Sequence, residues 1–190
     1  DLGRFEVWGM GEHIALDASL AILASLNEMD VEVAREKLKS YKGIKKRFDI
    51  LHKSDEFILI DDYGHHPTEI KATLKSALHY ARMMGHAEVS VVWQPHKYSR
   101  TIDNLESFVS CFEGVDRLIL LPVWRAGEKE VFIYFEKEFA RYKPLLAQRL
   151  KRVGASVEVL KEEQSVLTLN KGLVIFFGAG DITYQLRGIL

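Results

Sequence analysis

The chain has 190 residues, of which 47% are hydrophobic and 28% charged, and this composition is typical of a globular protein with one sizeable core. A formal net charge of -1 argues against broad nucleic-acid binding, so we expect no nucleic-acid partner. No apolar run approaches the roughly 20 residues that cross a bilayer, and no signal peptide is visible. We therefore expect a cytoplasmic protein without membrane insertion. The single cysteine, Cys111, excludes an internal disulfide, and its place beside Phe108 and Phe112 indicates a buried thiol.

The first 44 residues read as a short, mostly helical segment. Arg4–Trp8 predicts a strand, and apolar spacing predicts helices over Glu12–Asn27 and Val31–Tyr41. Asp30 stands where an N-cap of the second helix belongs. Residues 43–46 then read as a linker.

Strands and helices alternate from residue 45 to the end of the chain. We predict strands at Phe57–Ile60, Val89–Trp93, Leu118–Leu121, Val157–Leu160 and Leu173–Phe177, and helices near 67–84, 101–112, 136–153 and 183–190. Such alternation is typical of right-handed crossovers and a mainly parallel sheet with helices on both faces. The expected fold class is therefore α/β, Rossmann-like, preceded by the short helical segment.

Three apolar runs end in loops rich in chemically capable side chains. Residues 61–69 read Asp-Asp-Tyr-Gly-His-His-Pro-Thr-Glu, residues 94–100 read Gln-Pro-His-Lys-Tyr-Ser-Arg, and residues 178–181 read Gly-Ala-Gly-Asp. In an open parallel sheet, ligands bind at the carboxyl ends of the strands. If the three strands are parallel neighbours, their polar ends meet at one edge and form a site.

Each loop also has a simpler structural interpretation. Asp61 or Asp62 can cap the following turn, and His66 before Pro67 can be a surface residue held extended by the proline. The basic residues of 96–100 can be a solvated loop, and a GxG without a third glycine is a weak phosphate-binding signal. The recurrence at three equivalent positions favours a site over three independent accidents.

Several segments, in this order and rough spacing, resemble the Mur ligases, most closely the members that add L-alanine. The segments are Gly11–His13, Lys45–Asp49, Asp61–Glu69, Gln94–Thr101, Ala126–Glu128 and Phe177–Thr183. They extend over nearly the whole chain. The glycine-rich phosphate loop that family members carry near the start of their central domain, GxxxxGK[ST], does not occur here.

The resemblance implies that this chain is a fragment, inactive alone. Residues 1–44 would be the C-terminal part of the central ATP-binding domain, and residues 45–190 the Rossmann-like domain that receives the incoming amino acid. The remaining N-terminal and central domains of the same enzyme would be its partners. The implied activity is an ATP- and Mg²⁺-dependent ligase of peptidoglycan synthesis, which joins L-alanine to UDP-N-acetylmuramate through an acyl phosphate.

The resemblance also implies roles for individual residues. Arg47 matches an arginine that contacts ATP phosphate, and Asp62 an aspartate that contacts the nucleotide. Tyr63, His65, His96, Lys97 and Arg100 match positions around the amino-acid pocket. We expect Arg47 and His65 to be the catalytic residues. Arg100 and Lys97 suit the alanine carboxylate, although Lys97 replaces an arginine and lacks its fork of donors.

Some features leave other interpretations open. His65 and His66 are adjacent and no cysteine is near, so we expect no protein-bound structural metal. Ile14 stands where the family has an asparagine near the adenine, and residues 121–125 replace a more acidic stretch. A related ligase that attaches a recycled peptide, and a noncatalytic nucleotide- or amino-acid-binding module, are the alternatives.

Overall fold

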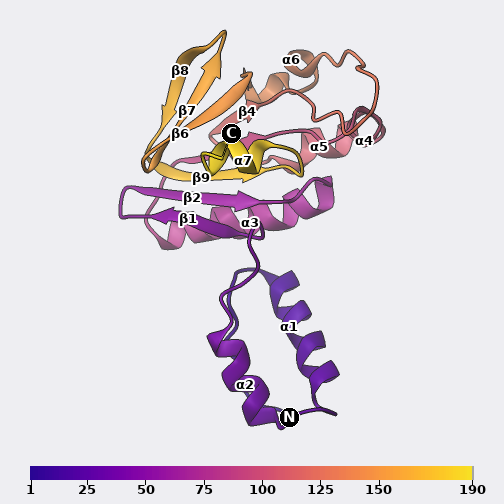
Figure 1. Cartoon of the computed structure of the whole chain (residues 1–190), viewed down its shortest axis with the longest axis vertical. Helices are drawn as coiled ribbons and strands as arrows, with labels where there is room; N and C mark the ends of the chain where they lie inside the picture. Colours follow the sequence, from indigo (N-terminus) through magenta and orange to yellow (C-terminus); the bar gives the residue numbers. More distant parts are fainter. Residues whose placement is uncertain (190) are drawn as a thin grey trace. The chain divides into compact units, whose positions relative to one another are not determined.

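The computed structural model describes residues 1–189, which form two compact units that meet in the chain between Lys45 and Lys46. Figure 1 shows the helices and strands of each unit. Among the described residues, none of the helices combines the length and the apolar character that crossing a bilayer requires.

The first unit contains two helices, as predicted. They are α1 (Glu12–Ser25) and α2 (Val31–Ser40). Asp30 is the N-cap of α2, and its Oδ1 accepts a hydrogen bond from the Glu32 N–H at 2.9 Å. The short polar side chain therefore begins this helix by satisfying a free main-chain donor.

The strand predicted at Arg4–Trp8 was wrong, because these residues have no regular structure. A strand requires a partner for its main chain. Here the Arg35 side chain occupies main-chain carbonyls instead, donating to the oxygens of Leu2 and Arg4 at 2.8 and 3.0 Å. The arginine also lies over the Phe5 ring, 4.9 Å from its centroid.

The second unit is built on a six-stranded sheet with the order β1-β2-β9-β3-β4-β5. Its strands are β1 (Asp49–Lys53), β2 (Phe57–Asp62), β3 (Val89–Trp93), β4 (Arg117–Leu120), β5 (Leu145–Leu146) and β9 (Gly172–Phe177). β1 is antiparallel to β2, and the other neighbours are parallel. The predicted mainly parallel α/β fold is confirmed. β1, in which buried and exposed positions do not alternate clearly, was missed.

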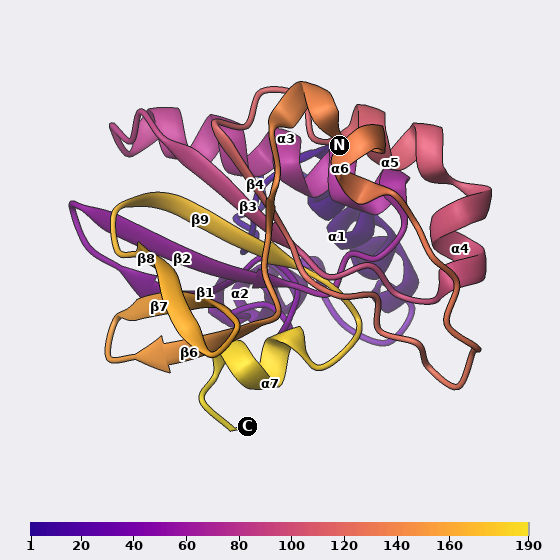
Figure 2. The same cartoon turned by 90° about the horizontal axis from the view of Figure 1, so that it is seen from above.

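Both faces of this sheet are covered, each by different elements (Figure 2). On one face lie α3 (Pro67–Met83) and α5 (Leu105–Cys111), whose apolar side chains pack against Ile58 and Ile60. On the other face, α7 (Ile182–Leu186) and a small second sheet pack against Phe57 and Leu59. Alternate residues of β2 thus enter different cores, as the two-residue period of a strand requires.

The helix predicted over 136–153 was wrong, and its last five residues belong to the small second sheet. Its antiparallel strands are β6 (Arg149–Val153), β7 (Ser156–Lys161) and β8 (Gln164–Leu169). Upstream of β6, the predicted range contains only the short helix α6 (Phe135–Glu138), the 3-10 turn η1 (Ala140–Tyr142) and β5 of the six-stranded sheet. Lys143 then adopts φ 46°, and Pro144 lacks an N–H, so the helix ends here.

Other predicted boundaries shift in the structure. The helix predicted over 101–112 is two helices, α4 (Tyr98–Asp103) and α5, with Asn104 at φ -119° between them. The strand predicted at Val157–Leu160 exists as β7 but belongs to the small sheet. The last predicted helix ends at Leu186, and Leu190 lies outside the described residues.

A buried ionic network holds α7 and β1 against the end of β2. Asp61 is 1% exposed, and its Oδ2 accepts hydrogen bonds from Thr183 Oγ1 and Arg187 Nη2, both at 2.7 Å. Arg187 Nη2 also donates to Asp49 Oδ2 at 2.6 Å. The carboxylate is buried but paired, which is the condition under which a charge is tolerated in a protein interior.

We expect Arg187→Met, which keeps the aliphatic stem, to lower the free energy of unfolding by about 3 kcal/mol, because it leaves the buried Asp61 carboxylate without its cation. Arg149→Met is the matched control, since Arg149 pairs with Glu163 on the surface, and there we expect about 0–1 kcal/mol. Urea denaturation of the two variants measures the difference. Equal losses would show that the Arg187 network contributes no more than a surface pair.

Candidate functional site

The loops that follow β2, β9 and β3 begin at the same level of the sheet. Phe177, the last residue of β9, is in register with Asp62 on one side and Trp93 on the other. The Gly178 N–H donates to Asp62 O at 3.2 Å, and the Gln94 N–H donates to Phe177 O at 2.9 Å. The predicted convergence of three polar loops at one edge is confirmed.

The turn between β2 and α3 is fixed by its own side chains. His66, exposed and extended at φ -113°, is the N-cap of α3, and its Nδ1 accepts from the Thr68 N–H at 3.3 Å. Glu69 Oε2 accepts from the N–H groups of His65 and His66 at 3.1 and 3.2 Å. The N-cap is therefore His66, not Asp61 or Asp62, and Glu69 completes a capping box that orients the preceding residues.

Arg47 lies beside this turn. Its guanidinium is 5.9 Å from the centroid of the Tyr63 ring and its Nη1 is 4.0 Å from Glu69 Oε1. The side chain is 53% exposed, so the charge remains available to a ligand. Arg47, Tyr63 and Glu69 therefore form one surface cluster.

His65 continues the cluster toward the loop that follows β3. Its ring centroid lies 5.4 Å from that of Tyr63 and 5.8 Å from that of His96. His65 Nδ1 is 3.2 Å from Tyr63 O and 3.5 Å from Glu69 Oε2, and both oxygens are acceptors. The Nδ1 atom therefore carries a proton, so that in the neutral tautomer Nε2 is the acceptor.

His96 connects the cluster to Arg100. Its Nδ1 is 3.2 Å from Arg100 Nη1, and because arginine only donates, this nitrogen accepts and Nε2 carries the proton. Burial, followed by the charges of Arg100, His65 and Lys97, lowers the pKa of His96. His96 is thus a neutral ring next to a cation.

Lys97 has a strained main chain. It adopts φ 70°, and its N–H donates to Trp124 O at 2.8 Å while its carbonyl accepts from Thr101 Oγ1 at 2.7 Å. A non-glycine residue in the left-handed region is uncommon and persists only where the surroundings fix it. These contacts place the sequence-predicted residues Arg47, Tyr63, His65, His96 and Arg100 in one continuous cluster, with Lys97 at its rim.

Asp62 lies beneath this surface. Its two oxygens accept from the N–H groups of Phe48 and Gly64, each at 2.8 Å, and the residue is 4% exposed. Burial raises the pKa of this carboxyl against the opposing effect of the two N–H groups. The carboxylate therefore holds main chain rather than facing solvent.

Sequence reasoning missed three residues that organise the edge. Burial alone would raise the pKa of Glu69. The pKa is nevertheless lowered, because burial is outweighed by the N–H groups of His65 and His66, the His65 ring and Arg47. Gln94 is 4% exposed and joins two loops, donating to Asp181 Oδ1 at 2.6 Å and accepting from the Ile182 N–H at 3.1 Å. A long polar residue directly after the apolar residues Val91–Trp93 was the available signal for Gln94.

The third missed residue, Glu128, ties the segment after β4 to α4. Its Oε1 accepts from Ser99 Oγ at 2.6 Å and its Oε2 from the Ser99 N–H at 3.1 Å. Gly180 also packs closely against the segment after β4, since a Cβ on Gly180 would be 2.7 Å from Trp124 Cβ. Gly180 is therefore required by close packing, which agrees with the tight-turn interpretation of the GxG.

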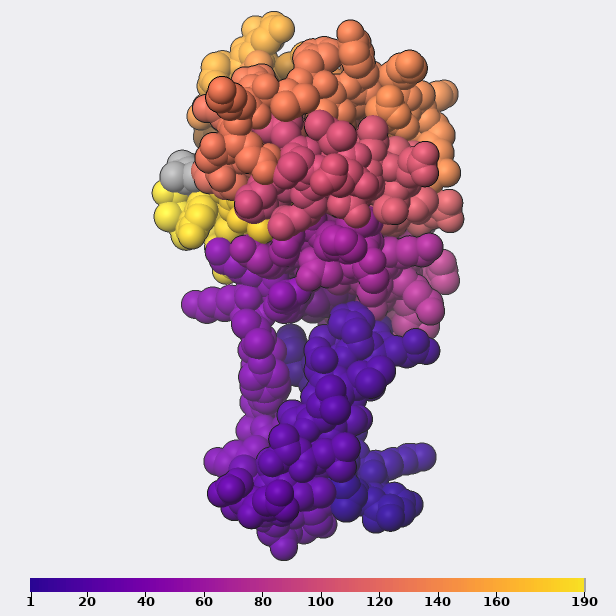
Figure 3. All heavy atoms as spheres, turned by 90° about the vertical axis from the view of Figure 1, so that its right-hand side faces the viewer, coloured from indigo at the N-terminus to yellow at the C-terminus, as the bar shows by residue number. Residues whose placement is uncertain are grey.

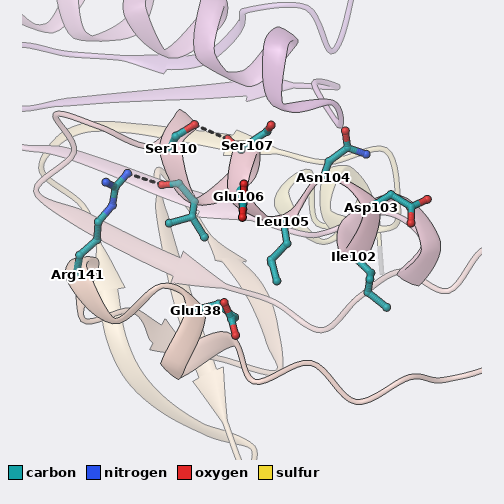
Figure 4. A pocket seen from close by; sticks show the side chains of 10 residues that line it. Ile102, Asp103, Asn104, Leu105, Glu106, Ser107, Ser110, Glu138 and Arg141 are labelled. Carbon is teal, nitrogen blue, oxygen red and sulfur yellow. Dashed lines mark hydrogen bonds between the residues drawn. The ribbon is translucent and has the colours of Figure 1, made fainter.

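A hollow of about 700 Å³ lies elsewhere, between α4–α5 and the α6–η1 segment. Figure 3 shows the pink residues of α4 and α5 next to the orange residues that follow β4. In Figure 4, the Arg141 guanidinium reaches the Val109 carbonyl, a hydrogen bond of 2.6 Å. The lining of this hollow contains none of the clustered residues named above. Cys111 is buried on α5, as predicted, and burial raises its pKa to about 12, which disfavours the nucleophilic thiolate.

Comparison with known proteins identifies the family. Residues 46–180 match the family model described as Mur ligase, glutamate ligase domain. The chain belongs to the Mur ligase family. Two relatives, both named UDP-N-acetylmuramate–L-alanine ligase, are 52% identical over 188 residues (Campylobacter curvus) and 55% identical over 190 residues (Helicobacter pylori). Each match covers 99% of this chain but only 43% and 42% of the relative, so this Mur ligase chain spans about two fifths of their length.

Solved structures agree on the fold. A UDP-N-acetylmuramate–alanine ligase from Thermotoga maritima matches with a TM-score of 0.69 and 24% identity, covering 96% of this chain and 38% of that one. A folylpolyglutamate synthase from the same organism matches with a TM-score of 0.62 and 20% identity, covering 98% and 40%. The Mur ligase fold is therefore shared with enzymes of different names.

The neutral state of His96 gives a prediction. Its pKa should lie below the ordinary value of about 6.5 and rise in Arg100→Gln, because the adjacent cation is removed. As the pH falls below about 6.5, the unfolded chain binds this proton before the folded chain does, so His96 should contribute a loss of stability on acidification. An NMR titration measures the His96 pKa in the parent and in Arg100→Gln. Arg117→Gln, at the opposite end of the parallel strands, is the control. A His96 pKa that is unmoved in Arg100→Gln would contradict the contact.

Proposed function

We propose that this chain is the C-terminal portion of an ATP-dependent ligase that joins L-alanine to UDP-N-acetylmuramate in peptidoglycan synthesis. The observation that carries the proposal is the convergence of His65, which follows β2, with His96 and Arg100, which follow β3. The names of relatives at 52% and 55% identity support the choice of substrates.

The two units suit two domains of such an enzyme. Residues 1–44 would be the C-terminal part of the central ATP-binding domain, and residues 45–190 the amino-acid-binding domain. The family match begins at residue 46, next to the boundary between the units. The α1 side chains Leu16, Leu20 and Leu23 are each about 60% exposed along one side of the helix, which is typical of a surface that packs against further protein. The N-terminal and remaining central domains of the same enzyme would cover it.

Arg47 would form the nucleotide side of the proposed site, and Asp62, which matches a nucleotide-contacting aspartate of the family, lies buried beneath it. The exposed Arg47 guanidinium suits a phosphate oxygen, and Glu69 at 4.0 Å is a weak partner that a phosphate would displace. Within residues 1–189, no three His, Cys, Asp or Glu side chains are grouped to hold a metal ion. Mg²⁺ would be held by the ATP phosphates and by the remaining domains of the enzyme, and it would supply charge for the phosphoryl transfer.

Tyr63, His65, His96, Lys97 and Arg100 form the amino-acid side. Arg100, oriented by the neutral His96, would bind the L-alanine carboxylate, with Lys97 as a second cation. The free Nε2 of His65 would accept a hydrogen bond from the amine and hold it toward the acyl phosphate that it attacks. Arg47 would stabilise the negative charge that the phosphate gains as it leaves.

Phosphate release by the complete enzyme that contains this chain tests the proposal. We expect ATP-dependent release that requires both UDP-N-acetylmuramate and L-alanine. Release with a murein peptide but not with L-alanine would favour the recycling ligase, and nucleotide binding without release would favour a noncatalytic module. The 190-residue chain alone should form no product, because it lacks the glycine-rich phosphate loop.

In the complete enzyme, Arg47→Ala should lower kcat by about a hundredfold or more while the melting temperature stays within a degree or two, because an exposed cation contributes little to stability. Lys45→Ala, two residues away in the same basic segment, is the matched control and should keep its kcat. Steady-state kinetics at varied ATP compares the variants. An Arg47 variant with the kcat and KM of the parent would be a solvated linker cation.

Arg100→Ala should raise the KM for L-alanine much more than the KM for ATP, with a loss of roughly 2 to 5 kcal/mol in kcat/KM if the carboxylate is left unpaired. His65→Ala should impair the same half-reaction. Arg82→Ala, an exposed arginine in the last turn of α3, serves as the control. If both site variants use L-alanine normally and only melt earlier, the two loops are structural turns.

A further inference from the structure

Asp62 connects two turns that carry different parts of the proposed site. Its Oδ2 accepts from the Phe48 N–H and its Oδ1 from the Gly64 N–H, each at 2.8 Å, and only 4% of the residue is exposed. Hydrogen bonds to an ionised acceptor are about twice as strong as neutral ones. One buried carboxylate thus bonds residues that lie 16 positions apart in the chain.

The first of these turns carries Arg47, and it is strained. Lys46 and Phe48, on either side of Arg47, adopt φ 66° and 46°. Left-handed conformations of non-glycine residues persist only where other contacts fix them. Here the fixing contacts are the Phe48 N–H bond to Asp62 and the Tyr63 N–H bond to Lys46 O, at 2.7 Å. Without Asp62, the turn that presents Arg47 loses one of these two hydrogen bonds.

The second turn carries Tyr63 and His65 on either side of Gly64. The space around Gly64 is filled, because a Cβ there would lie 2.8 Å from Asp62 Oδ1 and 3.3 Å from the Phe177 ring. The Gly64 main chain is therefore packed directly on the carboxylate. This contact sets the height of Tyr63 and His65 above the sheet edge.

We propose that Asp62 is a positioning residue that clamps the Arg47 turn and the Tyr63–His65 turn together, so that both halves of the site depend on one carboxylate. The proposal rests on the proposed function for the roles of Arg47 and His65. In this proposal Asp62 also positions the L-alanine side of the site, whereas a direct contact with the nucleotide would affect ATP alone.

Asparagine at position 62 separates the clamp from other roles. An ionised carboxylate accepts at both oxygens, whereas an amide has one acceptor oxygen and one NH₂ group, which would face an N–H donor. Asp62→Asn therefore keeps the size of the side chain and releases at least one turn. Asp116→Asn is the matched control, because Asp116 Oδ2 accepts the Val89 N–H at 2.8 Å at the opposite edge of the sheet.

Amide hydrogen exchange of the 190-residue chain tests the clamp without reference to activity. In the parent chain, the Phe48 and Gly64 amides should exchange slowly. Asp62→Asn should accelerate exchange at one or both by at least about tenfold, since a bond to a charged group contributes on the order of a tenfold equilibrium factor. Asp116→Asn should accelerate Val89 and leave Phe48 and Gly64 unchanged. Rapid exchange in the parent, or unchanged exchange in Asp62→Asn, overturns the clamp.

Kinetics of the complete enzyme test the consequence for the site. We expect Asp62→Asn to raise the KM for both ATP and L-alanine and to lower kcat by about ten- to a hundredfold, because small misplacements of site groups cost rates of this size. A rise in the ATP KM alone overturns the proposal in favour of a direct nucleotide contact. Unchanged kinetics with a lower melting temperature overturns it in favour of a purely structural carboxylate. If the parent enzyme does not ligate L-alanine, the proposed function fails and amide exchange alone decides the clamp.

Discussion

Two adjacent carboxylates at the end of β2 are the constraint on which the second unit depends. Successive side chains of a strand point to opposite faces, so Asp61 and Asp62 enter different layers. Asp61 holds α7 through Thr183 and Arg187, whereas Asp62 holds the main chain of two surface turns. A buried charge without partners costs several kcal/mol. The pair therefore determines where the last helix and the site turns can lie.

The site also depends on the strand that comes last in the chain. β9 lies between β2 and β3, so the loops that carry His65 and His96 come together only across a strand more than 75 residues further along the sequence. Main-chain bonds from Gly178 to Asp62 and from Gln94 to Phe177 set the three loops at one level. Assembly of the site is therefore coupled to completion of the sheet, and the site residues gain their geometry from long-range pairing.

How far the sequence predicts this fold depends on the element. β2, β3 and β9 are buried on both faces and read as continuous apolar runs, which is the signature of central parallel strands. β8 is mostly exposed and has no such run, so its existence depends on pairing with β7 and was missed. Residues 136–153 have helical spacing, yet Lys143 and Pro144 end the helix and the chain continues as β5 and β6. Local pattern is decisive only where no long-range contact competes with it.

The sequence gives the residue types of the site but not their partners. It places His65, His96 and Arg100 at strand ends, while the protonation of each ring follows from contacts that only the fold creates. Because His96 Nδ1 accepts from Arg100 and the pKa of His96 is lowered, a neutral ring holds the guanidinium in a fixed direction. Because Tyr63 O and Glu69 hold the Nδ1 proton of His65, its neutral tautomer has Nε2 as the acceptor. One histidine thus orients a cation and the other offers a lone pair, and this difference suits the two ends of an amino acid.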